Sequence, residues 1–143
     1  MTRRRLLVLV VAAVVASATL SGVLLSGGGA SAALQRDTYS SCLKHANSTF
    51  ETDQCVAAEL KRLKPLLANA YNGLVKSPDT DARHRRIVVA SQKAWTTYMK
   101  RDCAIAGDNF RGGTLSPVAE SMCRVDRERT RIKDLKAFAN SGG

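Results

Sequence analysis

One apolar stripe in the middle of the chain constrains the fold more than any other feature of the sequence. Its members follow one another at steps of four and three residues, and they are Val56, Leu60, Leu63, Leu67, Ala70 and Leu74. Only an α-helix gathers residues at that spacing on one face. Ser48 and Glu51 have the S-x-x-E spacing of a capping box and predict where this helix begins. Pro65 predicts a kink or a break inside it, since proline lacks the N–H that a helix needs.

Two more helices are predicted in the second half of the chain. One runs from about Asp81 to Ala106 and ends at Gly107. The other starts with Ser116 as its N-cap and Pro117 as its first residue. The side chains predicted to face inward from the former are Ile87, Val88, Ser91, Ala94, Trp95, Tyr98 and Cys103. Those predicted to face inward from the latter are Val118, Met122, Val125, Ile132 and Leu135.

Four cysteines in a small exported domain favour two disulfides over a metal site. They are Cys42, Cys55, Cys103 and Cys123, and their spacings of 13, 48 and 20 do not suit zinc. Four cysteines permit three pairings, and the predicted helix ends favour Cys42 with Cys55 and Cys103 with Cys123. Residues 39–46 can add a short helix, and nothing alternates with period two. The predicted fold is therefore all-α, a small disulfide-stapled bundle of three main helices plus a short N-terminal helix.

The first 32 residues have the composition of a signal peptide. Three arginines, Arg3 to Arg5, precede an apolar run, and Ala30-Ser31-Ala32 gives an A-x-A cleavage pattern. The run over residues 6–25 is also long enough to span a bilayer, so a retained N-terminal anchor that tethers the domain to the membrane is the alternative. We expect a polar lead-in over 33–38, one domain over 39–139 and a disordered tail over 140–143. Either leader places the domain outside the cytoplasm, as a secreted or membrane-anchored protein.

The charge of the chain favours anionic partners. It carries 22 Lys and Arg against 12 Asp and Glu, a net charge of +10, and three of those cations lie in the leader. Arg83, Arg85 and Arg86 are candidate binding residues, because positive charge in the first turns of a helix is unfavourable to the helix dipole. Export and the lack of aromatic residues between the basic ones argue against nucleic acid as the partner.

Motifs in the second half of the chain resemble a known family. Gln92, Trp95 and Tyr98 stand at steps of three before Cys103, and Cys123 follows later; the remaining motif residues are Gly112, Gly113, Thr114, Pro117, Arg131 and Leu135. This pattern is similar to the LprI-like lysozyme inhibitor family of bacterial exported proteins and covers most of the domain predicted over 39–139. The resemblance implies an all-helical, disulfide-stapled envelope domain and, for some members, inhibition of lysozyme.

The motif residues are expected to be mainly structural. Gln92 should pack beside Trp95 and Tyr98 and bond to a neighbouring loop. The Gly112-Gly113-Thr114 loop either presents backbone to a partner or only lets Cys103 meet Cys123. Arg131 is either a contact residue or a partner of Glu128, three residues earlier on the same helix.

Nothing in the sequence predicts catalysis, a cofactor or a metal. The carboxylates are scattered, His45 and His84 have no Ser or Cys motif beside them, and no glycine-rich phosphate loop precedes a helix. Two functions remain. The first is stoichiometric occlusion of a lysozyme-type muramidase, although basic animal lysozymes would repel this basic chain at long range. The alternative is an envelope-associated structural or adhesion module that binds an anionic cell-wall polymer.

Overall fold

The computed structural model describes residues 38–141, and over this range the fold is the predicted all-α bundle. A short helix spans residues 38–45, followed by α2 (Thr49–Val75), α3 (Ala82–Asp108) and α4 (Leu115–Asn140). The expected signal peptide, the tether over 6–25 and the end of the expected tail lie outside these residues. Within 38–141 no helix combines the length and the hydropathy that crossing a bilayer requires.

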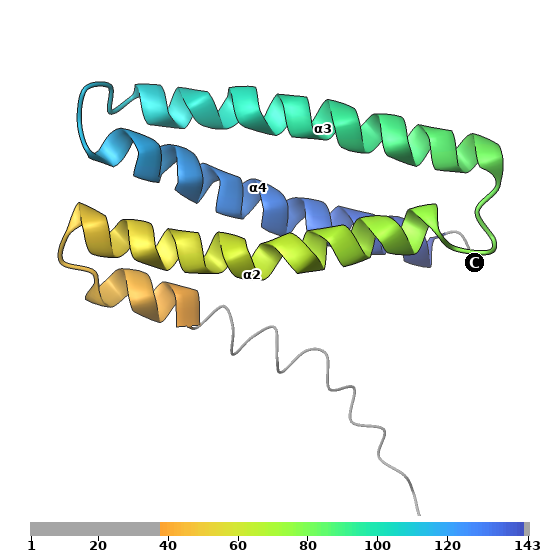
Figure 1. Ribbon diagram of the computed structural model, residues 1–143, viewed down its shortest axis with the longest axis horizontal. Coiled ribbons are helices and arrows are strands. Elements are labelled where there is room, and N and C mark those ends of the chain that lie inside the picture. Colours follow the sequence, from red (N-terminus) through yellow and green to blue (C-terminus); the bar gives the residue numbers. More distant parts are fainter. Residues whose placement is uncertain (1–37, 142–143) are drawn as a thin grey trace, which may run out of the picture.

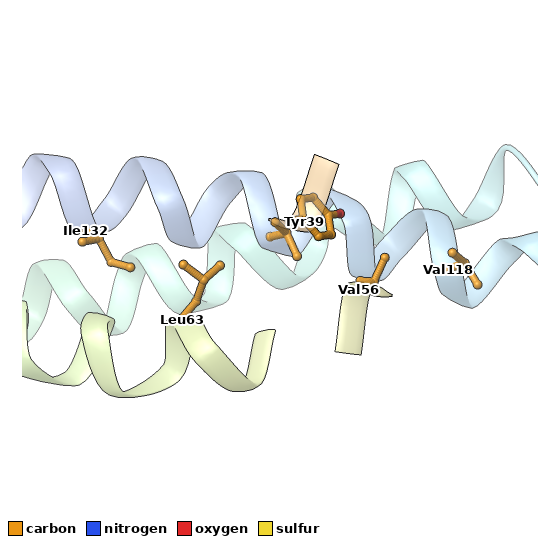
Figure 2. Packing of buried hydrophobic residues seen from close by; sticks show 6 residues of the cluster. Tyr39, Val56, Leu63, Val118 and Ile132 are labelled. Atoms are coloured by element: carbon orange, nitrogen blue, oxygen red, sulfur yellow. The ribbon is translucent and has the colours of Figure 1, made fainter. Parts of the chain in front are cut away.

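Helix α4 is the centre of the bundle. It packs along both α2 and α3, which contact each other only slightly (Figure 1). The main core brings together Val56 and Leu63 of α2 with Val118 and Ile132 of α4, and the short helix adds Tyr39 (Figure 2). A second cluster of Leu74, Val88 and Leu135 closes the other end. The 4/3 stripe of α2 thus buries itself against α4, as helix periodicity predicts.

Helix α2 begins as predicted and passes through Pro65 without a break. The Ser48 Oγ accepts from the Glu51 N–H at 3.1 Å, and the Glu51 carboxylate accepts in return from the Asn47 N–H. Pro65 is exposed, whereas Leu63 two residues earlier is buried against α4. Packing on both sides of the proline holds the helix together. Of the kink or break that the sequence predicts at Pro65, the break does not occur.

The corner between α3 and α4 differs from the prediction at both helix ends. Gly107 lies inside α3, which continues to Asp108, and α4 starts at Leu115 with Thr114 as its flanking residue. A Cβ on Gly107 would lie 3.1 Å from the Ser116 carbonyl oxygen, so the glycine permits a close approach of the two helices. Ser116 is not the N-cap, because its hydroxyl donates to the Gly107 carbonyl oxygen at 2.8 Å.

Both predicted disulfides are confirmed. Cys42–Cys55 fastens the short helix to α2 with a Cα–Cα distance of 5.8 Å. Cys103–Cys123 joins α3 to α4 with a Cα–Cα distance of 5.4 Å. The two cross-links therefore tie the outer elements to the helices that carry the core.

Candidate functional site

The outward side of α3 carries an apolar face that no other helix within residues 38–141 covers. It consists of Ile87, Ala94, Tyr98 and Ile105, called here the outer face of α3. Ile87, Tyr98 and Ile105 are 53%, 52% and 64% exposed, so the prediction that Ile87, Ala94 and Tyr98 point into the core is wrong. The physical reason is that α4 is the main partner of α3 and covers only one of its two apolar stripes.

The buried stripe of α3 includes one residue that sequence reasoning missed. Val88, Met99 and Cys103 are buried and Trp95 is half-buried. Met99 was missed because the sequence shows two helical stripes of similar hydrophobicity and does not say which one meets α4. Ser91 is exposed, but its hydroxyl accepts a hydrogen bond from Arg131 of α4.

Basic and polar side chains border the outer face of α3. A shallow depression there is lined by Ala90, Lys93, Ala94, Thr97, Tyr98, Arg101, Asp102 and Ile105. Tyrosine and arginine are both enriched in protein contact surfaces. Lys93, Arg101 and Ile105 are candidate contact residues that the sequence alone did not single out.

Contacts to α4 hold Tyr98 in place on this face. The Arg127 guanidinium carbon lies 5.9 Å from the centroid of the Tyr98 ring. Arg127 in turn donates to the Asp102 carboxylate from Nε at 2.8 Å, and Cys103 next to it is bonded to Cys123. The outer face of α3 is thus presented by a cross-linked pair of helices rather than by a mobile loop.

The other motif residues form an internal network between α3 and α4. Arg131 is only 7% exposed and donates to the Gln92 Oε1 from Nε at 3.0 Å and to the Ser91 Oγ at 3.0 Å. Its guanidinium carbon also lies 5.7 Å from the centroid of Trp95. Two expectations are therefore corrected: Gln92 bonds to α4 rather than to a loop, and Arg131 pairs with α3 rather than with Glu128. The cause is that Arg131 points across the interface and not along its own helix.

A buried carboxylate of α2 organises a second network. Glu59 is 4% exposed and accepts from Arg62 on its own helix and from Arg129 on α4, the latter at 2.8 Å. Arg129 also lies over the Tyr39 ring, with 4.6 Å between its guanidinium carbon and the ring centroid. Burial raises the pKa of Glu59, but the hydrogen bonds from Arg62 and Arg129 outweigh it and hold the pKa below its ordinary value.

The basic cluster at the start of α3 divides into two kinds of residue. Arg85 donates to the Val75 carbonyl oxygen at 2.8 Å and to the Thr80 carbonyl oxygen at 3.1 Å, so it closes the turn between α2 and α3. Arg83 and Arg86 are exposed, and neither forms an ion pair with any residue of the segment 38–141. Of the three arginines in this cluster, Arg83 and Arg86 therefore keep their cations available for a partner.

The remaining motif residues shape the corner and the core. Gly112 has φ of +83°, a left-handed conformation that favours glycine, and the Gly113 N–H donates to the Phe110 carbonyl oxygen at 3.0 Å. Thr114 and Pro117 flank the start of α4, and Leu135 is fully buried in the core. The loop thus turns the chain so that Cys103 and Cys123 meet.

One group of described residues has the geometry of metal ligands but not the chemistry. It consists of Asp102, Cys103 and Cys123, whose ligand atoms lie within 4.8 Å of one another. Both sulfurs belong to the α3–α4 disulfide, and the Asp102 carboxylate is paired with Arg127. This group therefore offers no thiolate to a metal ion.

Comparison with known proteins agrees with the resemblance found in the motifs. The family model described as lysozyme inhibitor LprI matches residues 41–135. An uncharacterized protein of Rhizobium meliloti (strain 1021) is 32% identical over 88 residues, which make up 59% of this chain and 63% of the relative, so the chain spans less than two thirds of that relative. No solved structure matches the chain. The family match covers nearly all of the described helices and both disulfides, and the chain belongs to the lysozyme inhibitor LprI family.

Proposed function

We propose that this protein is exported and inhibits a lysozyme-type muramidase by binding it one to one and covering its catalytic cleft. The observation that carries the proposal is the family match over residues 41–135, which covers nearly all of the cross-linked bundle. The protein acts by binding alone, with no chemistry of its own. Export rests on the signal-like leader and agrees with the two disulfides, which form in oxidising compartments.

The contact surface in this proposal is the outer face of α3. Its exposed Tyr98 and Ile105 supply apolar area, and tyrosines are frequent energetic hot spots of interfaces. Lys93 and Arg101 border that area, and muramidase clefts carry a pair of carboxylates beside the scissile bond. A cationic rim around an aromatic centre is complementary to such a cleft.

The rigidity of this surface adds to its suitability for inhibition. Binding costs free energy when loops and side chains must be ordered, and a surface that is already ordered avoids much of that cost. The Arg127 guanidinium, which pairs with Asp102, lies beside the Tyr98 ring, and the Cys103–Cys123 disulfide fastens α3 to α4 five residues further along. The partner therefore meets Tyr98 in a fixed orientation.

Salt dependence gives a first test of this function. The chain without its leader carries a net charge of +7, because 19 cations then face 12 anions. Repulsion between this chain and a basic animal lysozyme is screened over about 8 Å at physiological ionic strength. We expect lysis of bacterial cell walls by lysozyme to be blocked near a one-to-one ratio, and inhibition to hold or improve as salt is added.

The alternative function, binding to an anionic wall polymer, would show the opposite dependence on salt. It would weaken with added salt and with the double change Arg83→Ala and Arg86→Ala. Arg85 is left intact in that variant because it closes the α2–α3 turn. If lysozyme activity is unchanged at high molar excess while wall binding falls with salt and with the double change, the inhibitor proposal fails.

A further inference from the structure

A cleft is lined by residues of α2, α3 and α4. Helices α2 and α3 both pack along α4 but contact each other only slightly (Figure 1). The cleft encloses about 650 Å³, and its polar lining includes Gln92 of α3 and Arg124 and Glu128 of α4. We call it the central cleft. It shares no residue with the outer face of α3.

Arg124 is the exception among the arginines of α4 that face neighbouring helices. Arg127 is paired with Asp102, Arg129 with Glu59, and Arg131 with Gln92 and Ser91. The Arg124 Nε, by contrast, is buried and has no hydrogen-bond partner in the part of the chain that the structure describes. Buried donors without an acceptor are rare in native proteins, and the Arg124 side chain also lines the central cleft.

Glu128 lies one helical turn after Arg124 and does not supply that acceptor. Its side chain is 9% exposed, and it forms no ion pair with Arg124 or with any other residue of the segment 38–141. Burial raises the pKa of Glu128, and the charge of Arg124 offsets this only in part. The Glu128 carboxyl therefore takes up a proton more readily than usual, and in that form it donates a hydrogen bond.

The rim of the cleft adds further positive charge. Lys61 and Lys64 stand on α2 at the cleft, and both are exposed. Together with Arg124 they place three cations around a single acidic group. Leu67 and Tyr71 line the same wall and offer apolar contact to a carbon chain.

We propose that the central cleft binds a carboxylate group, which accepts hydrogen bonds from the Arg124 guanidinium and is attracted by Lys61 and Lys64. A guanidinium presents two parallel N–H groups that match the two oxygens of a carboxylate. The Arg124 guanidinium then gains an anionic partner, and a protonated Glu128 can donate to the same ligand. The carboxylate belongs either to a small free acid or to an acidic side chain of a peptide.

Titration followed by NMR tests this site in the unmodified protein. The probes are sodium propionate, the peptide N-acetyl-Gly-Glu-Gly-amide and the corresponding Gln peptide, and the signals are the amide resonances of residues that line the cleft, such as Leu67 and Gln92, which every variant retains. We expect these resonances to shift in a saturable way with propionate and with the Glu peptide, but not with the Gln peptide. Tighter binding of the Glu peptide would identify a peptide side chain as the preferred source, and equal binding would identify any free carboxylate.

Three variants separate the site from general attraction between charges. Arg124→Gln should weaken binding roughly tenfold or more, because it removes a charge-assisted hydrogen bond. Lys133→Gln removes an equal charge from an exposed position of the same helix and should change binding by less than about twofold. Glu128→Gln removes the negative charge but keeps a donor, so binding should be equal or tighter.

Three results would overturn the proposal. The first is a set of cleft resonances that neither propionate nor the Glu peptide moves. The second is a titration of Arg124→Gln that matches the unmodified protein, and the third is a Gln peptide that binds as well as the Glu peptide. Because the central cleft and the outer face of α3 have no residue in common, any of these failures leaves muramidase inhibition to be judged by its own test.

Discussion

Removing the Cys103–Cys123 disulfide through the double change Cys103→Ala and Cys123→Ala is expected to lower the free energy of unfolding by about 3 kcal/mol. The cross-link closes a 20-residue loop and ties α3 to α4. Without it, the unfolded chain gains conformational freedom, and the buried Cys103 site loses packing. Thermal unfolding followed by Trp95 fluorescence should show a midpoint lower by roughly 15 °C.

Two control proteins accompany this measurement. Lys100→Ala changes an exposed residue of the same helix and should shift the unfolding free energy by less than about 0.5 kcal/mol. Removing Cys42–Cys55 should release the short helix with Tyr39 while α2, α3 and α4 stay folded, which hydrogen exchange can resolve. An unchanged midpoint after loss of Cys103–Cys123 would show that this cross-link does not support the bundle.

The second large effect is expected from Glu59→Gln. This change removes the charge that accepts from Arg62 and Arg129 and leaves two partly buried guanidinium groups without their anion. We expect a loss of about 2 to 3 kcal/mol in the free energy of unfolding, measured by denaturant titration at neutral pH. Asp53→Asn is the matched control, since Asp53 is exposed on the same helix.

The pH dependence of this effect has a defined sign. The pKa of Glu59 is lower in the folded protein than in the unfolded chain, so its contribution to stability is fully present above the ordinary value for Glu, about 4.3. That contribution is lost as the pH falls through the folded pKa. The difference in stability between the unmodified protein and Glu59→Gln should therefore be constant near neutral pH and shrink below about pH 4. A difference that grows on acidification would contradict the assigned network.

The helices and disulfides could be predicted because each rests on a short-range pattern. Steps of four and three residues identify α2, and helix-end positions are sufficient to pair Cys103 with Cys123. Helix boundaries near Ser116 were wrong because its hydroxyl has a partner nine residues earlier, the Gly107 carbonyl oxygen. A local capping rule does not include such a tertiary competitor.

The surface of α3 could not be predicted from the sequence for a different reason. Tyr98 and Met99 are neighbours on adjacent stripes, and one is exposed while the other is buried. The choice depends on where α4 lies, which is tertiary information. The same holds for Arg131, whose partner Gln92 stands 39 residues away. Gln92, Trp95 and Arg131 were expected to be mainly structural, and the contacts they make between α3 and α4 emerged only from the packed helices.

The most direct test of the central claim measures inhibition of an animal lysozyme by the unmodified protein and by the double variant Tyr98→Ala and Ile105→Ala. Both changes truncate exposed side chains on the outer face of α3 without altering charge. Phe50→Ala is the control, since Phe50 is an exposed aromatic residue at the start of α2. The thermal midpoint of each variant verifies that it is folded.

Truncating a hot spot costs at least about 2 kcal/mol of binding free energy, which corresponds to roughly 30-fold weaker inhibition. The account therefore predicts inhibition near one to one for the unmodified protein and for Phe50→Ala, and at least that loss for the double variant. It would be contradicted by lysozyme that stays fully active at high molar excess of the unmodified protein. It would equally be contradicted by a folded double variant that inhibits as well as the unmodified protein.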